Sequence, residues 1–84
     1  MAEEKIGEVI KYFSKPGVAA IKVMVGELKV GDVIKFVGHT TDFEETVESM
    51  EVDNSKVDKA PAGSMVGIKV KDRVRAGDEI FKIV

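Results

Sequence analysis

Four consecutive polar residues, His39, Thr40, Thr41 and Asp42, form the chemically most varied stretch of this 84-residue sequence. They offer hydrogen-bond donors and acceptors, together with an imidazole, the ring that exchanges a proton near neutral pH. One interpretation is a ligand-binding loop. The other is that the Thr and Asp side chains cap the amides of their own turn while His39 faces water.

A second set of candidate residues is basic. Lys69, Lys71, Arg73 and Arg75 crowd a short stretch near the C-terminus, and Lys22 lies in an earlier apolar run. The first hypothesis is that these five residues form a basic rim, since phosphate contacts supply much of the affinity for nucleic acid. The alternative is an ordinary solvated strand face.

Acidic residues oppose this basic set. The net charge is -2, and the segment from residue 42 to 53 carries six acids and no base. These are Asp42, Glu44, Glu45, Glu48, Glu51 and Asp53. Since an RNA binder is usually basic, this stretch favours a second hypothesis, a protein-interaction adaptor that docks to a catalytic partner.

The residues needed for catalysis are largely missing. No segment has the G-x-x-x-x-G-K-[ST] pattern that cradles a nucleotide phosphate, so we expect no nucleotide hydrolysis. His39 is the single histidine and there is no cysteine, which leaves too few ligands for a histidine or thiolate metal site. We expect no enzyme, no cofactor and no metal. A third hypothesis, a small hydrolase, predicts activity that is lost on His39→Ala.

Composition indicates one folded domain spanning residues 1–84. The hydrophobic fraction is 44% and the charged fraction 33%, and no low-complexity linker divides the chain. No stretch approaches the ~20 apolar residues of a membrane span, and we expect a cytoplasmic protein without a membrane partner. Gln is absent and Asn54 is the only Asn, a bias typical of thermophilic proteins.

Short apolar runs separated by glycine-containing turns must position these residues, and helical periodicity is nearly absent. Lys15-Pro16-Gly17 predicts a hairpin turn, and the near-repeats 29–32 and 75–78, each ending in Gly-Asp, predict structural turns. Tyr12 and Phe13 either form a platform on which bases stack, or place one ring in the core with the other ring covering it. The predicted strands are 6–13, 18–25, 32–37, 43–52, 56–59, 65–71 and 79–84, with a bulge or corner near Ser49 that changes the buried face.

These turns resemble a known family. The segment from Gly26 to Ile34 and the later Ala76-Gly77-Asp78 are similar to domain 2 of elongation factor Tu and related translation GTPases. The segments 38–43 and 46–50 are similar to the barrel appended to collagenase-like peptidases linked to RNA modification. The resemblance implies an all-β fold, a single closed Greek-key β-barrel of about six to seven strands.

In the tRNA-carrying factors that barrel holds the terminal adenosine of an aminoacylated acceptor end. The resemblance places Glu48 where those factors pack a glutamate against the adenine, and Lys22 where they carry a basic residue. Glu51 stands where the family has an arginine, and Met65 where it has a polar side chain. The implied function is a non-catalytic binding module whose partners are tRNA, rRNA or the ribosome, or alternatively a protein.

Overall fold

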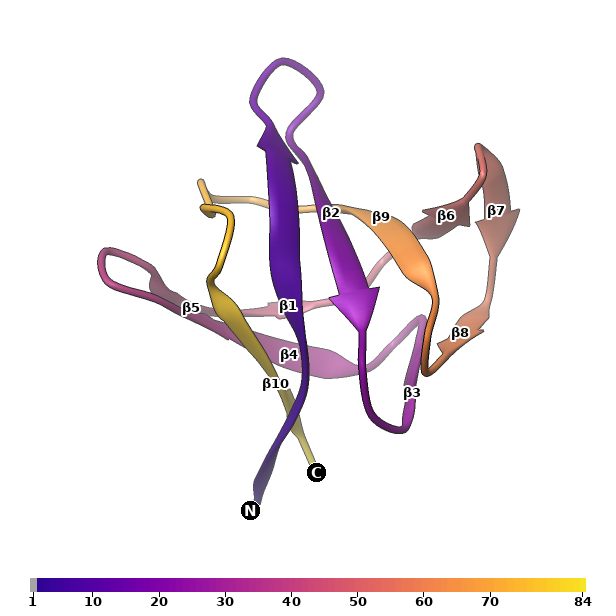
Figure 1. The fold of residues 1–84 in the computed structure, drawn as a ribbon. Coiled ribbons are helices and arrows are strands. Elements are labelled where there is room, and N and C mark those ends of the chain that lie inside the picture. The colour runs from indigo at the N-terminus through magenta and orange to yellow at the C-terminus, as the bar shows by residue number, and fades with distance from the viewer. Residues whose placement is uncertain (1) are drawn as a thin grey trace.

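The computed structural model describes residues 2–84, and these form an all-β fold without a helix (Figure 1). The strands are β1 (Glu3–Phe13), β2 (Val18–Val23), β3 (Glu27–Lys29), β4 (Val33–Val37), β5 (Asp42–Thr46), β6 (Met50–Val52), β7 (Ser55–Val57), β8 (Lys59–Pro61), β9 (Met65–Lys69) and β10 (Glu79–Ile83). The predicted all-β class is confirmed. The number of strands was underestimated, because β3, β6, β7 and β8 are only three residues long and too short to show an alternating pattern.

The strands pair in one eight-stranded sheet of order β5-β4-β10-β1-β2-β9-β6-β7 and one two-stranded sheet, β3-β8. Among residues 2–84, no ladder joins the outer strands β5 and β7, so the predicted closed barrel is wrong. The physical reason lies at residues 47–49, where the predicted strand 43–52 breaks into β5 and β6. β5 therefore pairs only with β4, whereas β6 pairs with β9 and β7, and the bonds of Val47 to Gly31 and Asp32 lie on the β4 side.

The sheet curls around a core built by strict alternation in its central strands. In β2, Ala19, Ile21 and Val23 are buried, and in β9 Val66 and Ile68 face the same side. Burying one such side chain contributes about 1.5–3 kcal/mol. The change of face predicted near Ser49 is confirmed in that Val47 and Met50, of opposite parity, are both buried on either side of the break.

Two equivalent turns lead directly into the strands β4 and β10. In each turn a glycine takes a positive φ, 99° at Gly31 and 94° at Gly77. The following aspartate folds its carboxylate back: Asp32 Oδ2 accepts from the amide of Lys29 and Asp78 Oδ2 from that of Arg75, both at 2.8 Å. The predicted structural role of both Gly-Asp repeats is confirmed.

Each turn also binds the backbone of one buried valine. The Gly31 amide donates to the Val47 carbonyl and the Val47 amide to the Asp32 carbonyl, both at 2.8 Å. The Gly77 amide and Asp78 carbonyl hold Val9 in the same way, again at 2.8 Å. The two halves of the fold therefore use the same local device to fasten β5 to β4 and β1 to β10.

A close approach between β1 and β2 lets the sheet curl. Gly7 lies between two register shifts of β1, one against β10 and one against β2. A Cβ at this position would overlap the backbone carbonyl of Lys22, which no side-chain rearrangement can relieve. Residue 7 must therefore be glycine for the two strands to pair as they do.

We expect Gly7→Ala to lower the free energy of unfolding by at least about 2 kcal/mol, measured by urea denaturation, because backbone must move to admit the methyl group. Gly67→Ala is the matched control. Its Cβ would lie 3.5 Å from a Val18 methyl, an ordinary contact, and should change stability by less than about 1 kcal/mol. Equal stabilities of the two variants would contradict the assigned close approach.

Candidate nucleic-acid interface

The outer face of β1, β2 and β9 is arranged in rows, since residues that pair across neighbouring strands project to the same side. Phe13 pairs with Val18, which pairs with Lys69. The next row is built by Lys11, Ala20 and Gly67, with Glu51 of β6 opposite Gly67, and a third row by Glu8, Lys22 and Met65.

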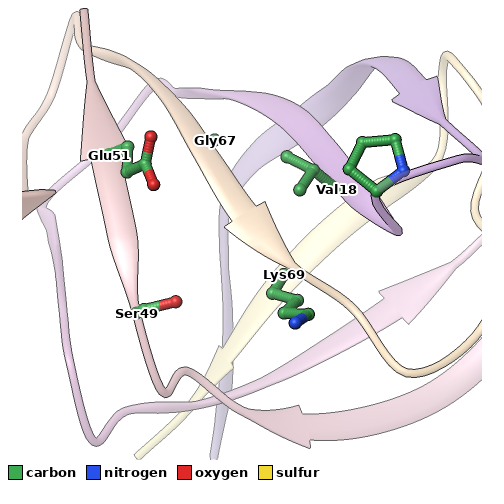
Figure 2. Close-up of a pocket in the computed structure, with 6 residues that line it drawn as sticks. Val18, Ser49, Glu51, Gly67 and Lys69 are labelled. Atoms are coloured by element: carbon green, nitrogen blue, oxygen red, sulfur yellow. The ribbon is translucent and has the colours of Figure 1, made fainter. Parts of the chain in front are cut away.

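The missing side chain of Gly67 leaves a shallow groove in the middle of this face. Figure 2 shows Lys69 and Glu51 on either side of Gly67, with Ser49 near the end of the groove. The groove has a volume of about 270 Å³, below the ~300 Å³ at which small-molecule sites begin. An adjoining hollow extends it past Ala20 and Met65 to the β6–β7 turn.

The groove contains some of the positions implied by the family resemblance and excludes others. Glu51 and Met65 both line it or its extension. Glu48 instead lines a separate hollow with Lys56 and Asp58, and Lys22 lines neither part of the groove. The groove therefore does not bring together Glu48 and Lys22, the two residues that the resemblance places at an acceptor-end pocket.

The predicted basic rim is brought together only in part. Lys69 ends β9, while Lys71, Arg73 and Arg75 follow it in the exposed segment that leads to β10 (Figure 1). Lys22 pairs with Met65 at the other end of the β2–β9 ladder, four residues and about 13 Å from the Val18–Lys69 pair. We therefore call only residues 69, 71, 73 and 75 the basic segment.

The charges of the basic segment are available to a ligand. Within the described part of the chain there are four ion pairs, and their cations are Lys5, Lys29, Lys35 and Lys82. None belongs to the basic segment. An acid does lie close by, since Glu45 Oε1 accepts a hydrogen bond of 2.9 Å from the backbone amide of Lys71.

Residues 39–41 lie at the tip of the β4–β5 hairpin, and Asp42 begins β5. The turn is closed by the backbone, with the Gly38 amide donating to the Thr41 carbonyl at 2.7 Å. His39, Thr40 and Asp42 are exposed, whereas Thr41 is 4% exposed and unavailable to a ligand. A Cβ on Gly38 would overlap the Asp78 carboxylate, so the hairpin base packs against the turn that carries Arg75.

Among residues 2–84, no cluster of three or more His, Asp or Glu side chains could hold a metal ion. No helix in that range is long and apolar enough to cross a membrane. The geometry thus presents an outer face with exposed cations and a shallow groove.

The family model for elongation factor G domain 2 matches residues 7–83. The chain belongs to this family. Its 78 best-matching residues are 38% identical to a protein named collagenase from Porphyromonas gingivalis, covering 92% of this chain and 22% of that protein. The chain thus spans about a fifth of the length of the curated relatives it matches.

Solved structures show the same fold. The C-terminal domain of a Geobacillus thermoleovorans putative U32 peptidase has a TM-score of 0.88 and 23% identity, over 96% of this chain and 93% of that domain. The GDP-bound factor aIF5B from Aeropyrum pernix has a TM-score of 0.67 and 14% identity, over 98% of this chain and 14% of the factor. Both resemblances predicted from the sequence, to translation GTPases and to the peptidase-associated domain, are confirmed.

The Gly38–Asp78 contact yields a stability prediction. Gly38→Ala should cost about 1–3 kcal/mol through its overlap with the carboxylate, and Asp78→Ala should cost a similar amount because the part-buried Arg75 amide loses its acceptor. The double variant should lose less stability than the sum of the two single losses, by at least about 1 kcal/mol. The reason is that Asp78→Ala removes the carboxylate that the added methyl group would overlap.

The control for this cycle pairs Gly38→Ala with Asp32→Ala. Asp32 caps the equivalent turn without approaching Gly38, so these two costs should add. Additive costs in the Asp78 cycle, measured by urea denaturation, would show that the hairpin tip and the Arg75 turn are independent.

Proposed function

We propose that this protein is a non-catalytic RNA-binding module of the cytoplasm, and that its basic segment contacts the phosphates of tRNA, rRNA or the ribosome. The observation that carries the proposal is the gathering of Lys69, Lys71, Arg73 and Arg75 in one exposed segment outside every ion pair among residues 2–84. Each such cation releases condensed counterions when it neutralises a phosphate.

The shape of the outer face supports binding without catalysis. The groove beside Lys69 is small, open and lined by Glu51, and within the described residues no second histidine accompanies His39. The relatives named proteases are about five times longer than the matched segment, so their names do not assign proteolysis to this chain. Affinity therefore rests on charge and contact, and we propose no chemical step.

The role of the neighbouring acids is to limit which nucleic acids bind. Glu45 lies against the Lys71 amide and Glu51 faces Lys69 across the groove. A duplex laid flat on this face would bring its phosphates near these carboxylates, where like charges repel. A single strand that follows the basic segment can avoid them.

Filter binding to tRNA and rRNA fragments at varied salt tests this function. If the four cations each contact one phosphate of unpaired RNA, log Kd should change with log salt with a slope of about 3. The variant K69A/K71A/R73A/R75A should lose most of the affinity and most of the slope.

The matched control is K5A/K29A/K56A/K59A, which removes the same number of positive charges from exposed lysines elsewhere. It should keep the slope of the parent protein. Two results would overturn the proposal, namely no RNA binding at low salt, or equal losses in both quadruple variants, which would indicate an effect of net charge alone.

A second candidate function is a protein adaptor that docks to a catalytic partner. Met24, Val25 and Met65 are 49%, 62% and 48% exposed at the end of the β2–β9 ladder opposite the basic segment. The similar solved domain is the C-terminal domain of a putative U32 peptidase, and it therefore forms part of a larger protein. A partner docked on this surface would shield the three apolar side chains from water.

The adaptor function predicts co-elution with a separately expressed U32-type peptidase domain from the same genome. M24S/V25S/M65S should abolish the complex, because apolar area would no longer be buried. The K69A/K71A/R73A/R75A variant should bind like the parent protein. A complex that survives M24S/V25S/M65S would rule out this docking surface.

A further inference from the structure

One aromatic ring of the protein stands apart from the core. Phe13, the last residue of β1, is 42% exposed, whereas the neighbouring Tyr12 projects to the other face and packs on the core. The remaining aromatic side chains are buried or half-buried. The sequence left open which of the two adjacent aromatics would be free, and the register assigns the core position to Tyr12.

The surroundings of Phe13 are cationic. Lys11, two residues earlier on the same face, places its Nζ 5.1 Å from the ring centroid, a cation–π distance. Lys69 follows Phe13 and Val18 in the same outer row, two strand spacings or about 10 Å away. The Val70 amide donates to the Gly17 carbonyl at 2.9 Å, which fixes the basic segment to the turn of this hairpin.

The hairpin tip also leaves room beside the ring. Tyr12, Phe13, Ser14, Lys15 and Pro16 line an open hollow of about 480 Å³. Lys11 covers one side of the phenyl ring, so a planar group can approach from the open side. Phe13 thus offers a flat apolar ring with an open hollow beside it. The lysines around the ring are Lys11, Lys15 and Lys69.

We propose that Phe13 is a stacking platform for an unpaired RNA base, with the phosphates on either side of that base held by Lys11 and Lys69. This inference rests on the proposed function, and it names the class of ligand as single-stranded RNA. Bases in a duplex have their faces covered by neighbouring bases, whereas an unpaired base offers its face to an aromatic side chain. Stacking tolerates any base, so the platform adds affinity without strong sequence preference.

The test uses oligouridylate, which does not form a duplex, and a perfectly paired RNA duplex. Phe13→Ala should weaken binding of oligouridylate by about 5- to 100-fold and leave the salt slope unchanged, because no charge is removed. Binding of the duplex should change by less than about 2-fold, since it offers no free base face.

Phe13→Trp supplies a rescue and a direct signal. The chain contains no tryptophan, so the introduced indole is its sole reporter. Oligouridylate should bind at least as tightly as to the parent protein and should quench the indole emission on stacking. Val25→Trp, placed at a 62% exposed position near the other end of the ladder, is the matched control and should not be quenched.

The outcomes separate this inference from the proposed function. If the parent protein binds RNA with the expected salt slope but Phe13→Ala binds oligouridylate equally well, stacking is refuted and the basic segment stands. If Phe13→Trp and Val25→Trp are quenched alike, the contact is nonspecific and stacking is again refuted. If the parent protein binds no RNA at low salt, both proposals fail.

Discussion

The fold depends on two Gly-Asp turns that each fasten the backbone of a buried valine. At Gly31-Asp32 and Gly77-Asp78 the glycine takes a positive φ, the carboxylate returns to an amide three residues earlier, and two 2.8 Å hydrogen bonds hold Val47 or Val9. These contacts join segments far apart in the chain, where closure entropy must be offset. One turn thereby holds β5 beside β4, and the other holds β1 beside β10.

The same constraint positions the outer face. The second turn fixes the end of the segment that follows β9, and the bond from Val70 to Gly17 fixes its beginning. The exposed cations between these two points are thereby held beside the β1–β2 hairpin. The scaffold thus places charge and an aromatic ring on one surface, separate from a core of aliphatic side chains and Phe36. Family membership describes this scaffold, and the ligand is determined by the residues on the surface.

Much of the fold could be predicted from the sequence because turn chemistry is local. The hairpin at residues 15–17, the Gly-Asp turns and the all-β class follow from glycine, proline and alternation. The missing ladder between β5 and β7 could not be predicted, because three-residue strands such as β6 and β7 show no alternating period. At the site, the segment 69–75 was recognisable from composition. The separation of Lys22 and the exposure of Phe13 instead of Tyr12 depend on register, which a single sequence does not reveal.

In the proposed complex, RNA contacts the β1–β2 hairpin and the basic segment together. This is tested by titrating the ¹⁵N-labelled protein with oligouridylate at low salt and monitoring the amide chemical shifts. We expect shift changes concentrated in residues 11–17 and 69–75 that reverse when salt is added. Shifts confined to the opposite end of the ladder around Met24 and Met65, or no shifts at all, would contradict it.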